Sequence, residues 1–317
     1  MEVQPPAAAA PLTTPVAEES ARGALRITAL AIGQGDATLL ESPDGLAALI
    51  DAGPPGAGAG IVLPYLAARG IQRLHITIAS HYDSDHIGGM AEVFHGPDQI
   101  PQTADDLLPE ACWDRGGAIP DDHPASRLYA DRRVPCHHVL SPGERIGLGS
   151  EVAITVLAVN GRFADGREVP LDPADENAHS AALLIQYGDF LYLTAGDLPG
   201  GGGKPPYETI DLETPLLPLL PRLQVLHVSH HGSRTATTAA LLQAAAPRAA
   251  IISAGEANPY GHPHPSIVER LLAAQIPIYL TEQGREDLPA AISVAGGPIV
   301  VETDGKDFRI DVQSATP

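Results

Sequence analysis

The sequence predicts an α/β protein with a four-layer αββα sandwich, in which two mixed β-sheets pack together and helices cover their outer faces. Two observations lead to this fold class. Short apolar runs bounded by turn residues recur in both halves of the 317-residue chain, and helical runs lie between them in both halves. A hydrophobic content of 44% is ample for a packed core.

In the N-terminal half, residues 25–53 predict three short strands with turns at "GQGD" and "SPDG". A helix is expected over residues 61–69. Residues 74–79, "LHITIA", are apolar or β-branched and predict a buried strand. A second helix is expected over residues 86–94.

The C-terminal half continues the same alternation of strands and helices. Strands are expected over residues 151–159, 181–188, 190–197, 223–232, 249–255, 276–281, 298–302 and 307–312, with helices over 236–246 and 266–274. The segment "GDLPGGGGK" at 196–204 is expected to be a flexible loop, because Leu198 and Pro205 break the pattern of a phosphate-binding loop.

Two segments show no regular spacing of hydrophobic residues. Residues 1–22 are rich in proline and alanine and predict a disordered leader. Residues 96–145 are rich in Pro, Gly and Asp and predict a loop-rich insertion that covers or shapes a site. We therefore expect a single domain over residues 23–317, interrupted by this insertion.

Charge and composition narrow the function classes. The formal net charge of −20 disfavours binding of long nucleic acid, and no apolar stretch is long enough for a membrane span, so a soluble protein is expected. The sequence leaves open whether the protein is exported, as it would be if Met1 stands in place of a cleaved signal peptide or a lipid anchor. Cys112 and Cys136 form either one disulfide or two free thiols, and nothing in the sequence sets the oligomeric state.

Four apolar strands end abruptly in aspartate or histidine. The ends are Asp51, the run "SHYDSDH" at residues 80–86, Asp197, and the pair His230 and His231. Strand ends hold side chains rigidly at an open sheet edge, so these groups could converge on one site. Imidazoles and carboxylates together suit divalent ions, and a pair of bridged ions supports hydrolysis.

The motifs that carry these residues resemble a known family. The chain contains "IGQGDA" at residues 32–37, "LIDAG" at 49–53, "ENxxS" at 176–180, "HHGS" at 230–233 and "GHP" at 261–263. Their order is similar to that of the metallo-β-lactamase-fold superfamily, and within it to the branch typified by the soluble domain of the DNA-uptake protein ComEC. The match runs from about residue 25 to about residue 284.

The resemblance implies a site with two divalent ions. It assigns His81 and Asp83 to one ion, Asp85 and His86 to the other, and Asp197 to both. His231 would complete the second site with His230 beside it, although the roles of these adjacent histidines could be reversed. Asp51, and Asp36 in the same manner, would orient a ligand imidazole.

Two positions depart from the commoner pattern of the superfamily. Asp83 stands where a second histidine is usual, and Asn177 replaces the histidine of the third motif, although His179 lies two residues on and could approach the ion instead. Oxygen ligands shift the preference from zinc toward manganese or magnesium. The identity of the ions therefore stays open.

The activity that the resemblance implies is hydrolysis by a metal-bound hydroxide. Asp85 or Asp197 would orient the attacking oxygen, and His230 or His262 would protonate the leaving group or hold the oxyanion. A phosphodiesterase on small or short substrates is favoured. The alternatives are a ComEC-like nuclease, a lactam- or lactone-opening hydrolase, and a non-catalytic metal-binding module.

Overall fold

The computed structural model of the chain describes residues 23–120, 123–205, 208–256 and 258–313. The leader expected at residues 1–22 lies outside these residues. Within them, no helix combines the length and the apolar character that a membrane crossing requires.

The first sheet has eight strands in the described part of the chain, in the order β19-β18-β1-β2-β3-β4-β5-β6. Neighbours from β19 to β3 pair antiparallel, whereas β3 to β6 pair parallel, so the sheet is mixed as predicted. The strands are β1 Leu25–Ala29, β2 Thr38–Glu41, β3 Ala47–Ile50, β4 Ile76–Ile78, β5 Ala111–Asp114, β6 His137–Val139, β18 Ile299–Thr303 and β19 Phe308–Val312.

The second sheet follows the order β17-β16-β15-β14-β11-β10-β8-β7, with β9 paired to β8. Its strands are β7 Arg145–Leu148, β8 Val152–Val159, β9 Arg162–Phe163, β10 Ala182–Tyr187, β11 Phe190–Thr194, β14 Val225–His227, β15 Ala249–Ile252, β16 Ile278–Leu280 and β17 Ser293–Val294. The glycine-rich segment expected to be only a loop contributes β12, Gly200–Gly202, which pairs with β13, Thr209–Asp211.

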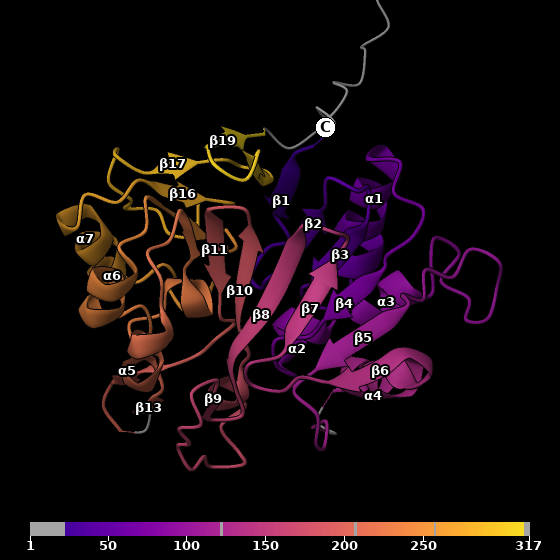
Figure 1. Cartoon of the computed structure of the whole chain (residues 1–317), viewed down its shortest axis with the longest axis horizontal. Helices are drawn as coiled ribbons and strands as arrows, with labels where there is room; N and C mark the ends of the chain where they lie inside the picture. Colours follow the sequence, from indigo (N-terminus) through magenta and orange to yellow (C-terminus); the bar gives the residue numbers. More distant parts are fainter. Residues whose placement is uncertain (1–22, 121–122, 206–207, 257, 314–317) are drawn as a thin grey trace, which may run out of the picture.

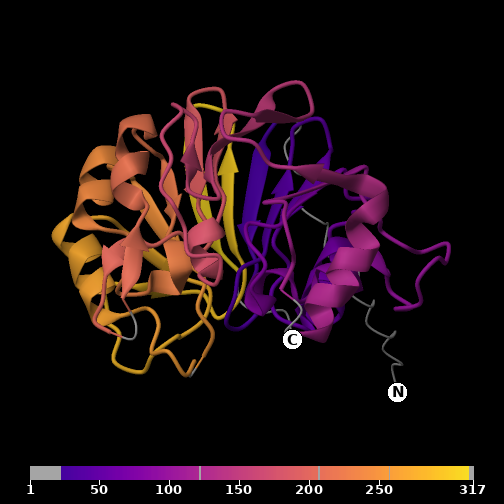
Figure 2. The same ribbon diagram turned by 90° about the horizontal axis from the view of Figure 1, so that it is seen from below.

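Helices form the outer layers on both sides of the paired sheets (Figures 1 and 2). The helical segments of the first half are η1 Gly58–Val62, α1 Leu63–Ala68, α2 Ser84–Ile87, α3 Met90–Phe94, α4 Pro124–Arg133 and η2 Val134–Cys136. Those of the second half are η3 Glu176–His179, α5 Glu213–Leu216, η4 Leu217–Leu219, η5 Ser229–Gly232, α6 Ala239–Ala245 and α7 Pro265–Ala273.

Three apolar cores separate the four layers. Alternation along a strand sends successive side chains to opposite faces: Leu40 of β2 joins the core between the two sheets, whereas Leu39 joins the core beneath α1 and α3. Leu226 of β14 likewise packs in the third core, with Leu241 of α6 and Ile267 of α7. The four-layer sandwich predicted from the sequence is therefore confirmed.

Parallel pairing brings the predicted polar strand ends together. Strand β3 is parallel to β4, with Ile50 opposite Ile78, and β11 is parallel to β14, with Leu193 opposite Leu226. Parallel neighbours end at the same sheet edge, which is where α/β proteins place their ligands. Asp51 and the run from residue 80 therefore follow neighbouring strand ends of the first sheet, and the residues after β11 and β14 follow neighbouring strand ends of the second sheet. Side chains from the two sets, such as His86 and Asp197, meet in one cluster.

The segment 96–145 contains more regular structure than its sequence predicts. It holds β5 and β6, which extend the first sheet in parallel, and the helix α4 in the outer layer. The strands are only four and three residues long, and α4 buries few apolar side chains, so neither leaves a clear period in the sequence. Pairing with β4, which is a tertiary contact, is what makes β5 a strand.

Cys112 and Cys136 are joined by a disulfide that links β5 to η2 across 24 residues of sequence. Both side chains are buried. A closed loop of this size removes conformational freedom from the unfolded chain. The disulfide therefore ties the edge of the first sheet to the segment that includes α4.

We expect the Cys112→Ala/Cys136→Ala double variant to lose about 3 kcal/mol of the free energy of unfolding, because the loop closure is lost. Urea denaturation of the chelator-treated protein measures this change. A non-thiol reductant should lower the urea midpoint of the wild-type protein and leave that of the double variant in place. A fully reduced wild-type protein with an unchanged midpoint would contradict the expectation.

Candidate metal centre

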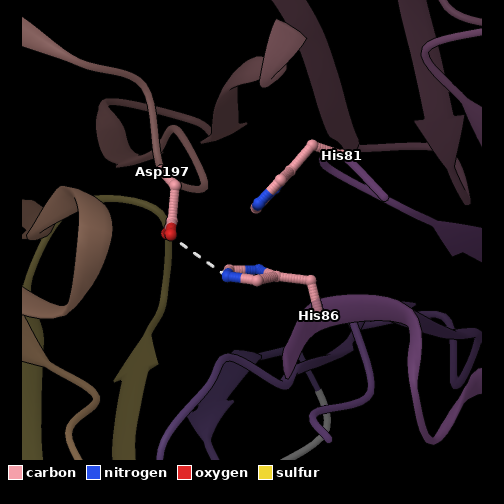
Figure 3. Close-up of side chains that lie close together, drawn as sticks. All are labelled: His81, His86 and Asp197. Carbon is pink, nitrogen blue, oxygen red and sulfur yellow. Dashed lines mark ion pairs between the residues drawn. The ribbon is translucent and has the colours of Figure 1, made fainter. Parts of the chain in front are cut away.

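His86 is oriented by a carboxylate at the end of β3. Asp51 Oδ2 accepts a hydrogen bond from His86 Nδ1 at 2.9 Å. Asp51 is itself held by Ser80, whose backbone N–H and Oγ–H donate to its two oxygens at 2.8 and 2.7 Å. The Nδ1 proton of His86 thus points toward Asp51, and Nε2 faces Asp197 Oδ1 at 3.2 Å (Figure 3).

His231 and His81 present Nε2 in the same way. His231 Nδ1 donates to the backbone oxygen of Ser253 at 3.1 Å, which leaves Nε2 near Asp85 Oδ2 at 3.4 Å and Asp197 Oδ1 at 3.5 Å. His81 Nδ1 lies 3.0 Å from Ser80 Oγ, whose hydrogen is already given to Asp51, so the imidazole is the donor. Imidazoles that ligate metals are held at the far nitrogen in this manner.

Several of the buried polar atoms that lack hydrogen-bond partners among the described residues lie in this centre, while others, such as Arg26 Nε and Thr28 Oγ1, lie elsewhere in the fold. Those of the centre are Nε2 of His81, His86 and His231, Oδ1 of Asp197, Oδ1 of Asp36 and Oδ1 of Asn177. Such atoms are costly to bury unless something satisfies them. The donor set of imidazole nitrogens and carboxylate oxygens suits a borderline to hard divalent cation, so these residues fit the ions that the motifs imply.

The donor atoms cluster closely enough for coordination. Three groups have ligand atoms within 4.8 Å of one another: His81, His86 and Asp197; Asp85, His86 and His231; and Asp36, Asp197 and His231. His86, Asp197 and His231 each belong to two groups, so the three groups form one connected centre.

The electrostatics of the centre keep its carboxylate ionised. Burial opposes charge on Asp197, but the imidazoles of His230, His231 and His86 outweigh it and hold the pKa of Asp197 well below its usual value. Burial also opposes charge on His231, but Asp197 and Asp36 raise the pKa of His231 to about 9. The centre is thus a set of mutually dependent charges at the end of two sheets.

Two glycines allow the backbone to approach the centre. A Cβ at Gly35, whose φ is +135°, would lie 2.2 Å from the backbone oxygen of Asp85, and one at Gly196, φ +51°, would lie 2.7 Å from Ser80 Oγ. These contacts explain the glycine before Asp36 in "GQGD" and the glycine before Asp197 in "AGD". His230 and His231 also have positive φ values of 54° and 53°, and this strained backbone is typical of functional sites.

A cavity of about 770 Å³ opens beside the centre. It is lined from four segments of the chain by Asp172, Ala174, Asp175, Asn177, Glu208, Thr209, Ile210, His230, Ser233, Arg234, Thr235, Tyr260, His262 and His264. Its volume suits a small molecule. No described residue of the segment 96–145 lines this cavity, and the expectation that the segment shapes the site entrance stays a prediction.

His230 and His262 are neutral groups at this cavity. Burial lowers the pKa of His262 to about 3, with the neighbouring His231 and His230 acting in the same direction. Burial is also the main reason that the pKa of His230 is lowered. Neutral imidazoles of this kind serve better as hydrogen-bond donors to an oxyanion than as acids for a leaving group.

The structure separates the alternatives at the third motif. His179 Nδ1 donates to Asn160 Oδ1 at 2.9 Å, whereas Asn177 lines the cavity with its Oδ1 unpartnered. This arrangement favours Asn177 as the residue that faces the centre. Asp83 lies at the margin of the centre. Its Oδ2 is 3.4 Å from His81 Nε2, and its side chain is 40% exposed. The ligand roles of Asp83 and Asn177 stay predictions.

The arrangement of the adjacent histidines favours the predicted order. His231 is buried and belongs to two of the close groups, whereas His230 Nε2 lies 3.5 Å from Asp197 Oδ2 outside them. Asp36 Oδ1 lies 3.4 Å from His227 Nε2 and 3.8 Å from His231 Nδ1, and neither contact is a hydrogen bond. Asp51, by contrast, makes the short contact to an imidazole that the motif implies.

Sequence reasoning missed several supporting residues. Ser80 and Ser180 hold Asp51 and the backbone N–H of Asp197, and both lie inside motifs, which is a usable signal. Ser253, which fixes His231, and Arg115, which binds Glu176, lie in segments without any motif. Only tertiary contacts identify these two.

Comparison with known families identifies the class of protein. The Metallo-beta-lactamase superfamily matches residues 30–256. The chain therefore belongs to this superfamily, whose members are typically hydrolytic metalloenzymes, and its fold implies divalent metal ions. The resemblance predicted from the motifs is confirmed.

Particular relatives include an operon protein and a recombination protein. The chain is 27% identical over 279 residues to ComE operon protein 3 of Bacillus subtilis (strain 168), covering 80% of this chain and 31% of the relative. It is 28% identical over 250 residues to Recombination protein 2 of Haemophilus influenzae, covering 78% and 26%. The chain thus spans only a quarter to a third of the length of these relatives.

Among solved structures, the metallo-beta-lactamase fold protein YhfI from Bacillus subtilis superposes with a TM-score of 0.50. The match covers 82% of this chain and 98% of YhfI at 12% sequence identity. At this identity the likeness concerns the fold alone. It agrees with the layer arrangement described above.

We expect Asp51→Asn to weaken binding of divalent ions roughly 10- to 100-fold, because the neutral amide holds the His86 imidazole less firmly and makes it less basic. Zinc competition against a chromophoric chelator measures the affinity. Asp131→Asn, a change at an exposed position on α4, is the matched control. Equal affinities in the two variants would show that Asp51 does not support a ligand.

Proposed function

We propose that this chain is a metal-dependent phosphodiesterase that acts on small or short substrates. The observation that supports the proposal most directly is the convergence of three buried imidazole Nε2 atoms on buried Asp197 Oδ1, none of them hydrogen-bonded among the described residues, beside a cavity of about 770 Å³. Divalent ions held there supply Lewis-acid chemistry to a phosphoryl group. The residues themselves do the remaining work.

The ligand side chains are held ready by contacts outside the centre. Asp51 and Ser253 hold the Nδ1 side of the His86 and His231 rings, so that their Nε2 atoms already face Asp197. Asp197 stays ionised because three imidazoles lower its pKa. Such advance placement is what allows electrostatic stabilisation without reorganisation during the reaction.

The cavity offers one cationic contact for a substrate anion, Arg234, although Asp172, Asp175 and Glu208 also line it. Arg234 is the sole arginine or lysine among the described residues that line it, and no described carboxylate forms an ion pair with it. Its guanidinium can pair with phosphate oxygens in two-point fashion. His230 and His262, both neutral, can donate hydrogen bonds to the same group.

A nuclease is the second candidate, and the names of the curated relatives favour it. Two curated relatives are named a competence protein and a recombination protein, and this chain aligns with parts of them. The formal charge of −20 opposes long polyanions, however. A lactam- or lactone-opening activity is less well supported, because Asp83 and Asn177 replace the histidines expected of that group.

We expect Asp197→Asn to lower phosphodiester turnover by more than about 100-fold. Substitution of a residue that supports a metal ligand usually costs about 10- to 100-fold, and substitution of a shared ligand itself should cost more. Turnover of bis-p-nitrophenyl phosphate with added manganese or zinc, together with elemental analysis, measures it. Asp131→Asn should behave as wild type. Full activity in Asp197→Asn would rule out the shared-ligand role, and wild-type protein that binds metal yet lacks this turnover would refute the phosphodiesterase proposal.

We expect Arg234→Gln to lower kcat/KM for bis-p-nitrophenyl phosphate roughly 10- to 100-fold, the usual effect of losing a hydrogen bond between charged groups. Neutral p-nitrophenyl acetate should be hydrolysed at an unchanged rate. Arg222→Gln, at an exposed position outside the cavity, is the control. A parallel loss on both esters would mean that Arg234 does not recognise the phosphate charge.

A further inference from the structure

A buried ion pair joins Arg115, directly after β5, to Glu176 at the start of η3. Arg115 Nε donates to Glu176 Oε1 at 2.7 Å, and Arg115 Nη2 donates to Oε2 at 2.6 Å. The two side chains are 9% and 11% exposed. Two parallel hydrogen bonds fix the plane of the carboxylate as well as its position.

Arg115 is itself rigidly held. Its Nη1 donates to the backbone oxygen of Gly116 at 3.0 Å, and its Nη2 also donates to that of Ala118 at 3.2 Å. The guanidinium lies 4.0 Å from the centroid of the Tyr82 ring. A cation held over an aromatic face and bound on several sides has little freedom to move.

Glu176 transmits this rigidity to the metal centre. Its Oε1 also accepts a hydrogen bond from the backbone N–H of Tyr82 at 2.8 Å, and Tyr82 directly follows His81. Glu176 is also the residue before Asn177, whose Oδ1 is buried and unpartnered. One carboxylate therefore holds the backbone beside two residues of the centre.

The backbone of Arg115 supports the other end of η3. Its carbonyl oxygen accepts a hydrogen bond from Asn160 Nδ2 at 2.6 Å, and Asn160 Oδ1 accepts one from His179 Nδ1 at 2.9 Å. Arg115 thus contacts η3 directly through Glu176 and indirectly through His179. Both ends of this short helix depend on the loop after β5.

We propose that Arg115 is a positioning residue for the metal centre, which it serves by clamping Glu176 and, through it, the backbone that carries His81 and Asn177. The inference rests on the proposed function in that the centre binds divalent ions. Arg115 does not line the cavity, so it acts through its neighbours. The segment 96–145 then contributes to the site as a support.

Cobalt titration of the metal-free, full-length chain tests the proposal, because the visible spectrum of Co²⁺ reports the geometry of its ligands. Arg115→Gln should lower the Co²⁺ affinity roughly 10- to 100-fold and alter the spectrum. Arg115→Lys should have an intermediate effect, since it keeps the charge without the two-point contact. Arg73→Gln, which breaks an exposed ion pair with Glu110, should change neither.

Wild-type affinity and spectrum in both Arg115 variants would overturn the proposal. Near-UV circular dichroism identifies any variant that fails to fold. If Arg115→Gln fails to fold, Arg115→Lys alone tests the proposal. A Co²⁺ titration of that variant identical to the wild-type titration would overturn the proposal. A purely structural role would lower the melting temperature while the spectrum of bound Co²⁺ stayed unchanged.

Glu176→Gln provides a second test, because the amide oxygen still accepts from Tyr82 but the charge is lost. It should reproduce the effect of Arg115→Gln, and the double variant should add little to either, since both act through one contact. Fully additive losses of affinity would contradict the proposal. A wild-type chain that binds Co²⁺ without phosphodiester turnover would refute the proposed function and leave this inference standing.

Discussion

The hydrogen bond between Asp51 and His86 is the interaction on which the metal centre depends. It joins the end of β3 to α2, and the donation from Ser80 to the same carboxylate joins it to the end of β4. These strands are parallel neighbours, so a buried carboxylate after one reaches side chains after the other. The pairing of two strands in the first sheet thereby sets the orientation of an imidazole that faces Asp197 of the second sheet.

Charge in the centre is balanced locally within a strongly acidic protein. The net charge is −20, yet Asp197 and the partly exposed Asp85 face imidazoles of the centre at 3.2 to 3.5 Å. Burying charges is tolerated only where they are paired or coordinated. The buried carboxylate of Asp197 is accordingly paired with the imidazoles of His86 and His231.

Strands with a clear pattern of apolar residues were predictable from the sequence. Strands that form only through pairing with distant segments were not. Strands β1, β2, β3 and β8 have apolar runs bounded by turns, and the site residues stand out because apolar runs end abruptly in Asp or His. Strand β6 has the sequence "HHV", and nothing in it indicates a strand. The roles of Ser253 and Arg115 arise from contacts 22 and 61 residues away along the chain, which no local pattern contains.

The sequence by itself determined the fold class, the superfamily and the residues that meet in the centre, because hydrophobic period and motif order are properties of the chain. The tertiary structure decided which atoms of those residues face one another. It placed Nε2 rather than Nδ1 of three histidines inward, directed Asn177 rather than His179 to the cavity, and joined Cys112 to Cys136. These choices follow from hydrogen bonds and packing between segments distant in sequence, and they exist only once both sheets are assembled.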